Sequence, residues 1–164
     1  MAVSLAKLGI RPGDRVVDLG CGTGKIAVAL SETAELVYAI DRRSEAIAYA
    51  REEAARAGRG NIEFFEGDAV EILPGLGSLD AAFVGGSRRL PEVLDLLADQ
   101  VRGRIVVNAV MVGTLHEAIA TMQHLGIFVE AVHLQVSRSA GIAGGTMFKP
   151  INPVYIVVGG AGCS

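Results

Sequence analysis

The chain has 164 residues, of which 51% are hydrophobic, 20% are charged, 5% are aromatic and none is Trp. This composition excludes a disordered chain, a collagen-like repeat and a disulfide scaffold, and the length suits one domain over residues 1–164. With 15 basic and 18 acidic side chains the net charge is −3, which disfavours nucleic acid as a partner.

The cysteines and apolar stretches indicate a cytoplasmic protein. Cys21 and Cys163 are the only cysteines, and neither belongs to a CxxC pair, so both are expected to be reduced thiols. The apolar stretch 105–112 is interrupted by Asn108 and is too short to span a bilayer. The first residues lack the apolar core of a secretory signal. We therefore expect no membrane partner.

Short β-branched runs alternate with segments of helical composition. In chain order, strands are expected at 15–19, 36–40, 61–65, 79–84 and 104–110. Helices are expected after the first glycine-rich loop and at 44–57, 90–101 and 113–125. Repeated strand–helix units specify a parallel sheet with helices on both faces.

The tail departs from this alternation. Strands are expected at 128–137 and 153–158 with no helix between them, joined by a Gly-rich loop over residues 139–152. Two consecutive strands without a crossover indicate an antiparallel hairpin. The predicted fold is therefore α/β, with a mostly parallel seven-stranded sheet ending in an antiparallel hairpin. This is typical of the methyltransferase variant of the doubly wound, Rossmann-like fold.

The first glycine-rich loop is the strongest local motif, with the sequence DLGCGTG at residues 18–24. A dinucleotide GxGxxG motif would need glycine where Lys25 stands. A P-loop would need glycine in place of Leu19 and a hydroxyl residue in place of Ile26. The remaining pattern, DxGxGxG, resembles the S-adenosyl-L-methionine loop of class I methyltransferases.

Two further acids support this interpretation by their spacing. Asp41 ends the second strand, where a carboxylate can accept both ribose hydroxyls of a nucleoside. Asp68 follows the third strand and can meet an adenine edge, although it can equally cap a helix, and Asp41 can equally be a solvated turn residue. The cofactor-binding residues predicted for S-adenosyl-L-methionine are Asp18, Gly20, Cys21, Gly22, Thr23, Gly24, Asp41, Arg42, Asp68 and Ala69.

Several acceptor chemistries find no support in the sequence. Amino methyltransferases of bases carry an Asn/Asp-Pro-Pro-aromatic motif after the fourth strand, where this chain has VGGS at 84–87. The similar NPVY at 152–155 precedes the last strand instead. Cys21 lies inside the cofactor loop, which disfavours a cysteine nucleophile. The three histidines, His116, His124 and His133, lack metal-ligand spacing, so no metal site is expected.

The tail sequence GGTMFKPINPVYI at 144–156 resembles one family, the decarboxylating cobalt-precorrin-6B C-15 methyltransferases of cobalamin biosynthesis. The stretches VVDLGCGTG, AIDR, GDA, FVGGS and IVVNAV match in order and spacing, so the resemblance covers nearly the whole chain. Only the tail and FVGGS discriminate among class I methyltransferases. The resemblance implies methylation of C-15, removal of the C-12 acetate carboxyl, and a homo-oligomer, a tetramer in this family.

A tetrapyrrole bearing many carboxylates demands cationic anchors. After Glu130 the chain carries no acidic residue, yet it has two cations in the tail. The candidate substrate anchors are Arg88, Arg89, Asn108, Arg138 and Lys149. Two alternatives stay open: the paired arginines face solvent, and the Gly-rich loop is a hairpin connector rather than a lid.

Other functions also stay open at this point. A class I methyltransferase with a different small-molecule or RNA acceptor, and an inactive cofactor-binding partner subunit, are both compatible with the first loop. The family resemblance implies a preceding Pro-Met-Thr-Lys-like segment with a threonine near the cofactor, which is not found before Ser4. Either a start further upstream or a more open cofactor site would account for that.

Overall fold

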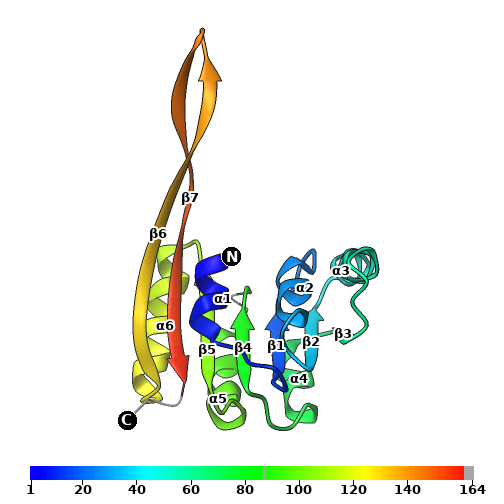
Figure 1. The fold of residues 1–164 in the computed structure, drawn as a ribbon. Helices are drawn as coiled ribbons and strands as arrows, with labels where there is room; N and C mark the ends of the chain where they lie inside the picture. The colour runs from blue at the N-terminus through cyan, green and yellow to red at the C-terminus, as the bar shows by residue number, and fades with distance from the viewer. Residues whose placement is uncertain (87, 161–164) are drawn as a thin grey trace.

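The computed structural model describes residues 1–86 and 88–160, which fold around one mixed seven-stranded sheet (Figure 1). The strand order is β3-β2-β1-β4-β5-β7-β6, with β1 to β5 parallel and β7 antiparallel to both β5 and β6. This confirms the predicted sheet and its antiparallel end. In chain order the elements are α1 (Ala2–Leu8), β1 (Arg15–Leu19), α2 (Lys25–Ser31), β2 (Leu36–Asp41), α3 (Ser44–Arg56), β3 (Ile62–Glu66), α4 (Ala69–Ile72), the 3₁₀ turn η1 (Leu73–Gly75), β4 (Ala81–Val84), α5 (Leu90–Gln100), β5 (Arg104–Ala109), α6 (Val112–His124), β6 (Phe128–Ile142) and β7 (Gly145–Gly160).

Two hydrophobic cores lie on the two faces of the sheet. Successive side chains of a strand point to opposite faces, so Val16 packs toward α1, α2 and α3 whereas Val17 packs toward α4, α5 and α6. Both side chains are fully buried. Strands covered on both sides need apolar residues at successive positions, which is why these segments read as continuous β-branched runs rather than alternating ones.

The short helix α1 was not expected from the sequence. It has seven residues, too few to be stable alone, and tertiary packing holds it in place. Leu8 is buried in the core beneath α1, and the Ser4 hydroxyl donates a 3.0 Å hydrogen bond to Oδ1 of Asn108 on β5. Helix α1 therefore lies against β5 and β4, with its first residue toward the carboxyl edge of the sheet (Figure 1).

The prediction of a Gly-rich loop at 139–152 is wrong, because both strands continue through these residues to a tight turn at 143–144. Beyond the Ala109–Tyr155 pair, β7 loses contact with β5 and pairs with β6 alone. We call residues 136–142 and 145–151 the β-ribbon; it projects past the carboxyl ends of the parallel strands (Figure 1). Its tight turn uses positive φ angles at Ala143 and Gly144, the conformation that two-residue hairpin turns require.

A register shift accommodates Pro153. Leu134 pairs with Val154 and Val136 with Ile151, so Asn152 and Pro153 face one residue of β6 in a β-bulge. Proline is tolerated there because a bulged residue is left out of the hydrogen-bond ladder. Gly144 is thus a turn position and Pro153 a bulge position, while Gly141, Gly145 and Pro150 are paired residues of one long hairpin. None of the helices in the described ranges is long and apolar enough to cross a membrane.

Candidate functional site

A pocket of about 420 Å³ lies at the carboxyl ends of β1 to β4. This is the edge at which open parallel sheets bind their ligands. Six of the residues predicted to bind cofactor or substrate line it: Gly20, Asp41, Arg42, Asp68, Ala69 and Arg88. The other lining residues are Leu19, Ile40, Arg43, Gly67, Val84, Gly85, Gly86 and Val93, which give it an apolar floor with charged walls.

The first glycine-rich loop is built for close backbone approach. Gly20, Gly22 and Gly24 have φ angles of +72°, +54° and +77°, which side-chain-bearing residues rarely adopt. A Cβ added to Gly20 would lie 2.9 Å from the amide nitrogen of Gly86. The amide of Gly85 also donates a 2.7 Å hydrogen bond to the carbonyl of Leu19. The loops after β1 and β4 therefore pack backbone to backbone, and FVGGS supplies the second half of that contact; its Ser87 lies outside the described residues.

Asp18 does not line the pocket but lies fully buried beneath the loop. Neither of its carboxylate oxygens has a hydrogen-bond partner in the described part of the chain. Burial raises the pKa of Asp18 to about 7, and the nearby charge of Asp41 adds to the effect. The backbone N–H of Ala27 partly offsets this rise in pKa without meeting hydrogen-bond geometry. Asp18 is therefore a buried acid close to its titration point at neutral pH.

Asp41 is held in place by two neighbours. Its Oδ2 accepts hydrogen bonds from the Gly22 amide at 3.0 Å and from Nη2 of Arg43 at 3.1 Å. Its Oδ1 accepts from the backbone nitrogen and Nε of Arg43, both at 3.1 Å. Burial works to raise the pKa of Asp41, but these hydrogen bonds outweigh it, so the pKa is lowered and the carboxylate stays ionised. Arg43 was missed from the sequence, since only the loop geometry places its guanidinium on Asp41.

Asp68 faces two arginines across the pocket wall. Its Oδ1 accepts a 3.0 Å hydrogen bond from the Val70 amide, which caps α4 as the alternative interpretation allowed. Arg88 Nε and Arg89 Nη1 each lie 3.9 Å from one of its carboxylate oxygens, and Arg89 also pairs with Glu92. Arg89 has a φ of +51°, a strained conformation for a residue other than glycine. The paired arginines thus stand at the pocket edge.

The remaining loop residues do not line the pocket. Thr23 is exposed, whereas Cys21 is buried and its thiol is free. Burial, together with the charges of Asp18 and Asp41, raises the pKa of Cys21 to about 12, so the thiol is protonated at neutral pH. Cys163 lies outside the described residues.

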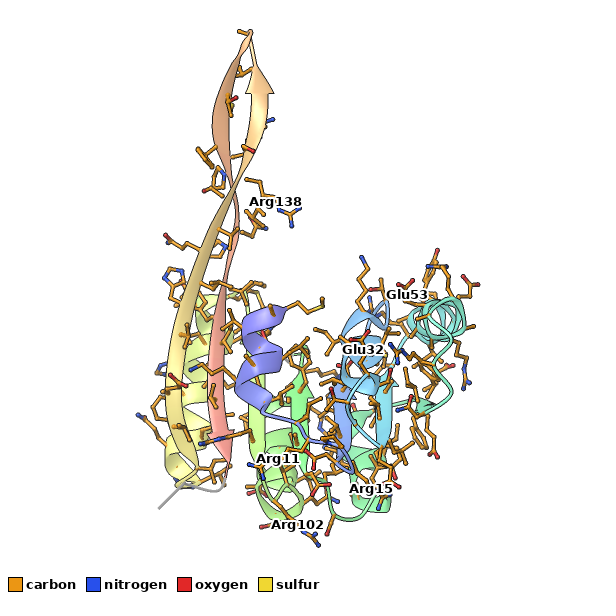
Figure 2. The ribbon with its side chains drawn as sticks, in the orientation of Figure 1. Arg11, Arg15, Glu32, Glu53, Arg102 and Arg138 are labelled. Carbon is orange, nitrogen blue, oxygen red and sulfur yellow. The ribbon has the colours of Figure 1, made fainter. Side chains whose placement is uncertain are left out.

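The structure does not bring the other predicted anchors to the pocket within one chain. Asn108 is half-buried and its side-chain oxygen is engaged by Ser4. Arg138 and Lys149 are exposed and directly opposite each other on the β-ribbon, with Arg138 standing well clear of the sheet in Figure 2. Lys149 is six residues beyond Tyr155, the last β7 residue paired with β5, which corresponds to roughly 20 Å of extended chain past that edge.

The family follows from comparison with known proteins. A family model described as the precorrin methyltransferase domain matches residues 1–159. The chain belongs to this family. A relative from Methanosarcina acetivorans, named probable cobalt-precorrin-6B C(15)-methyltransferase (decarboxylating), is 47% identical and is matched over 97% of this chain and 89% of its own. The relative of the same name from Methanothermobacter thermautotrophicus is 38% identical over 90% of this chain and 79% of its own.

Solved structures agree with this family membership. The precorrin 8W decarboxylase of Methanobacterium thermoautotrophicum superposes with a TM-score of 0.93 at 36% identity, covering 98% of this chain and 90% of that one. The precorrin-6Y C5,15-methyltransferase of Geobacter metallireducens superposes with a TM-score of 0.92 at 28% identity, covering 98% and 87%. The fold is that of the methyltransferases, and the family to which the chain belongs acts on precorrins.

Proposed function

We propose that this precorrin methyltransferase family member uses S-adenosyl-L-methionine to methylate C-15 of a cobalt-precorrin-6B-type tetrapyrrole and removes the carboxyl of its C-12 acetate. The observation that carries the proposal is the pocket at the carboxyl edge, where the glycine-rich loop and Asp41 adjoin a wall bearing Arg88 and Arg89. The names of relatives 47% and 44% identical to this chain support the C-15 position and the decarboxylation.

The residues present fit S-adenosyl-L-methionine. Gly20 leaves no room for a side chain between the β1 and β4 loops, so these loops meet backbone to backbone and present main-chain groups to the pocket that Gly20 and Gly86 line. Asp41, ionised at the end of β2, is placed to accept ribose hydroxyls, with Arg42 beside it. Asp68 and Ala69 line the pocket and are proposed to meet the adenine, and Asp18, Cys21, Gly22, Thr23 and Gly24 belong to the loop proposed to bind the cofactor. The bound cofactor supplies an activated methyl group on a sulfonium.

The residues of the chain position the tetrapyrrole acceptor and do not react with it. Arg88 and Arg89 lie beside the pocket and can pair with carboxylates on the tetrapyrrole rim. Asn108, Arg138 and Lys149 are proposed as further anchors for that rim. Holding a ring carbon in line with the methyl donor is mainly a task of orientation. When the acetate carboxylate leaves as carbon dioxide, the electron pair of the broken C–C bond passes into the conjugated ring, and a proton taken from solvent converts the remaining CH2 group into a methyl group.

Mass spectrometry tests this function directly. The purified protein is incubated with S-adenosyl-L-methionine and a precorrin-6B-type tetrapyrrole under anaerobic conditions. Gain of one methyl group together with loss of one carbon dioxide is expected. Methylation without loss of carbon dioxide would instead select another acceptor chemistry. Cofactor binding by calorimetry with no change in tetrapyrrole mass would indicate a cofactor-binding partner subunit.

We also propose that the protein is a cytoplasmic homotetramer. The β-ribbon supports an assembly, because it pairs with no other strand and leaves Phe148 70% exposed and Ile142 54% exposed. A two-stranded ribbon has little stability alone, and exposed apolar side chains at such a position favour a covering subunit. Light scattering of the full chain measures this: a tetramer is expected, and a monomer would contradict it.

A further inference from the structure

Three consecutive apolar side chains stand in solvent where β5 passes into α6. Val110 is 66% exposed, Met111 60% and Val112 67%. Most large apolar residues of the chain are packed into the two cores, and an exposed apolar side chain on its own needs no explanation. Three in succession form a contiguous apolar surface, which we call the β5–α6 segment. Surfaces of this kind mark binding sites.

The β5–α6 segment lies beside the pocket. Strand β5 is the immediate neighbour of β4, with Val84 paired to Val107, and neighbouring strands lie about 4.8 Å apart. Gly85, Gly86 and Arg88 follow β4 and line the pocket, so the residues that follow β5 flank its open side at the same edge of the sheet. On the other side of the segment the β-ribbon rises from β7, which pairs with β5 as far as Ala109 (Figure 1).

Folding does not require these apolar residues. Met111 occupies the N-cap position of α6 and makes no side-chain hydrogen bond there. Serine, threonine, aspartate or asparagine at that position would stabilise the helix, so methionine is a costly choice. The inward face of α6 is supplied by other residues, Thr114, Ala118 and Met122. A residue that is unfavourable for local structure and gains no packing contact is expected where the chain binds a ligand.

The adjoining charges indicate the kind of ligand. A large conjugated ring has apolar faces and, in a polycarboxylate tetrapyrrole, a rim of negative charge. The apolar segment follows β5, whereas Arg88 and Arg89 follow the neighbouring β4 and direct their guanidinium groups toward Asp68. A large ring can therefore cover the valine and methionine side chains while carboxylates on its rim reach the guanidinium groups across the pocket. We infer that the β5–α6 segment is the surface on which the tetrapyrrole acceptor lays its ring, beside the methyl-donor pocket; this inference rests on the proposed function.

Paired variants test the segment. Val110→Thr with Met111→Gln keeps side-chain size but makes the surface polar, and Val110→Ile with Met111→Leu keeps it apolar. The matched control is Tyr49→Gln with Val129→Thr, two exposed apolar side chains on α3 and β6 away from the pocket. Tetrapyrrole affinity is measured by absorbance titration in the presence of S-adenosylhomocysteine, which needs no turnover. Cofactor affinity, oligomeric state and turnover are measured alongside.

The polar pair is expected to weaken tetrapyrrole binding at least about tenfold, as lost apolar contacts do in specificity pockets, with unchanged cofactor affinity. The apolar pair and the control are expected to bind as the unmodified chain does. Unchanged tetrapyrrole affinity in the polar pair, an equal loss in the control, or a change of oligomeric state in the polar pair alone would overturn the inference. If the unmodified chain binds the tetrapyrrole without turning it over, the proposed function fails while the segment is still tested; if it does not bind at all, both fail.

Discussion

The pocket edge and the β-ribbon belong to the same sheet but use their residues in opposite ways. At the pocket, the loops after β1 and β4 touch backbone to backbone, and the Asp41 carboxylate accepts four hydrogen bonds. On the β-ribbon, the two strands pair with each other but most side chains are exposed, and Phe148 stands in solvent.

The two regions also differ in their charges. Arg88 and Arg89 face Asp68, whereas Arg138 and Lys149 stand opposite each other, and neither makes an ion pair with any other described residue. Like charges placed opposite on neighbouring strands are unfavourable. The pocket residues thus contact one another within the chain, whereas the charged and apolar side chains of the β-ribbon are left exposed. Substitutions in each region can break or sharpen this difference.

Replacing Gly20 with alanine should abolish measurable cofactor binding. The added Cβ would meet the Gly86 backbone at 2.9 Å, and backbone cannot move aside as a flexible side chain does. Calorimetry with S-adenosyl-L-methionine measures the affinity. Gly58→Ala is the matched control, because Gly58 has a similar φ of +66° with nothing within 4 Å of the added Cβ. The control should lose about 1 kcal/mol of stability yet keep its cofactor affinity; equal affinities in both variants would refute the close-approach argument.

The buried acid beneath the loop should make stability depend on pH. An unfolded aspartate has a pKa of about 3.9, whereas burial raises that of folded Asp18 to about 7. Between these values the folded state holds more protons, so the free energy of unfolding falls as pH rises from about 4 to about 7. Asp18→Asn should remove this fall, which is on the order of a few kcal/mol. Urea unfolding across that range measures it, and parallel pH profiles for the two proteins would contradict the prediction.

Reversing one charge on the β-ribbon should separate folding from function. Arg138→Glu converts a like-charge pair into an opposite pair with Lys149, which should stabilise the ribbon by up to about 1 kcal/mol. If the pair anchors substrate carboxylates, the same change should raise KM for the tetrapyrrole about tenfold. Thermal unfolding and steady-state kinetics measure the two effects. Lys149→Arg keeps both charges and should change neither; an unchanged KM for Arg138→Glu would remove the pair from the substrate site.

The smallest effect is expected at Arg43, whose side chain occupies acceptor positions on Asp41. Arg43→Ala should free these positions for ribose hydroxyls and tighten cofactor binding a few-fold, because less must be displaced on binding. Calorimetry checks this, with Arg56→Ala as control, since Arg56 pairs with Glu53 on the surface of α3. Weaker binding in Arg43→Ala would mean that the guanidinium itself assists the cofactor.

Strands flanked by helices were predictable because burial on both faces leaves a simple pattern. β1 coincides with the predicted 15–19, and α6 and β5 differ from prediction by one residue at their ends. The β-ribbon was not predictable in the same way, because glycine and proline have several uses. Gly144 forms a turn and Pro153 a bulge in a continuous hairpin, and composition alone does not distinguish these positions from a loop.

The site residues also differ in how far the sequence predicts them. Residues fixed by strand ends, such as Asp41 and Asp68, lie in the pocket where the topology of a parallel sheet requires them. Arg43 reaches Asp41 through one loop conformation, which the sequence does not reveal. Val110 to Val112 are found only from the structure, because no part of the described chain covers them and no sequence pattern predicts that exposure. Their positive charge predicts that Arg138 and Lys149 lie with the pocket residues. Only the length of the β-ribbon shows how far from the pocket they lie.

The place of β7 has a consequence for how the protein is made. β7 follows β6 in the chain but lies between β5 and β6 in the sheet. During synthesis, β6 therefore leaves the ribosome ahead of β7, the strand that separates it from β5 in the described sheet. It cannot join the sheet until β7 has been translated and has inserted at the edge of β5. The nascent chain thus carries β6 as an unpaired strand with partly apolar side chains until β7 has left the ribosome, and closure of the sheet waits for β7.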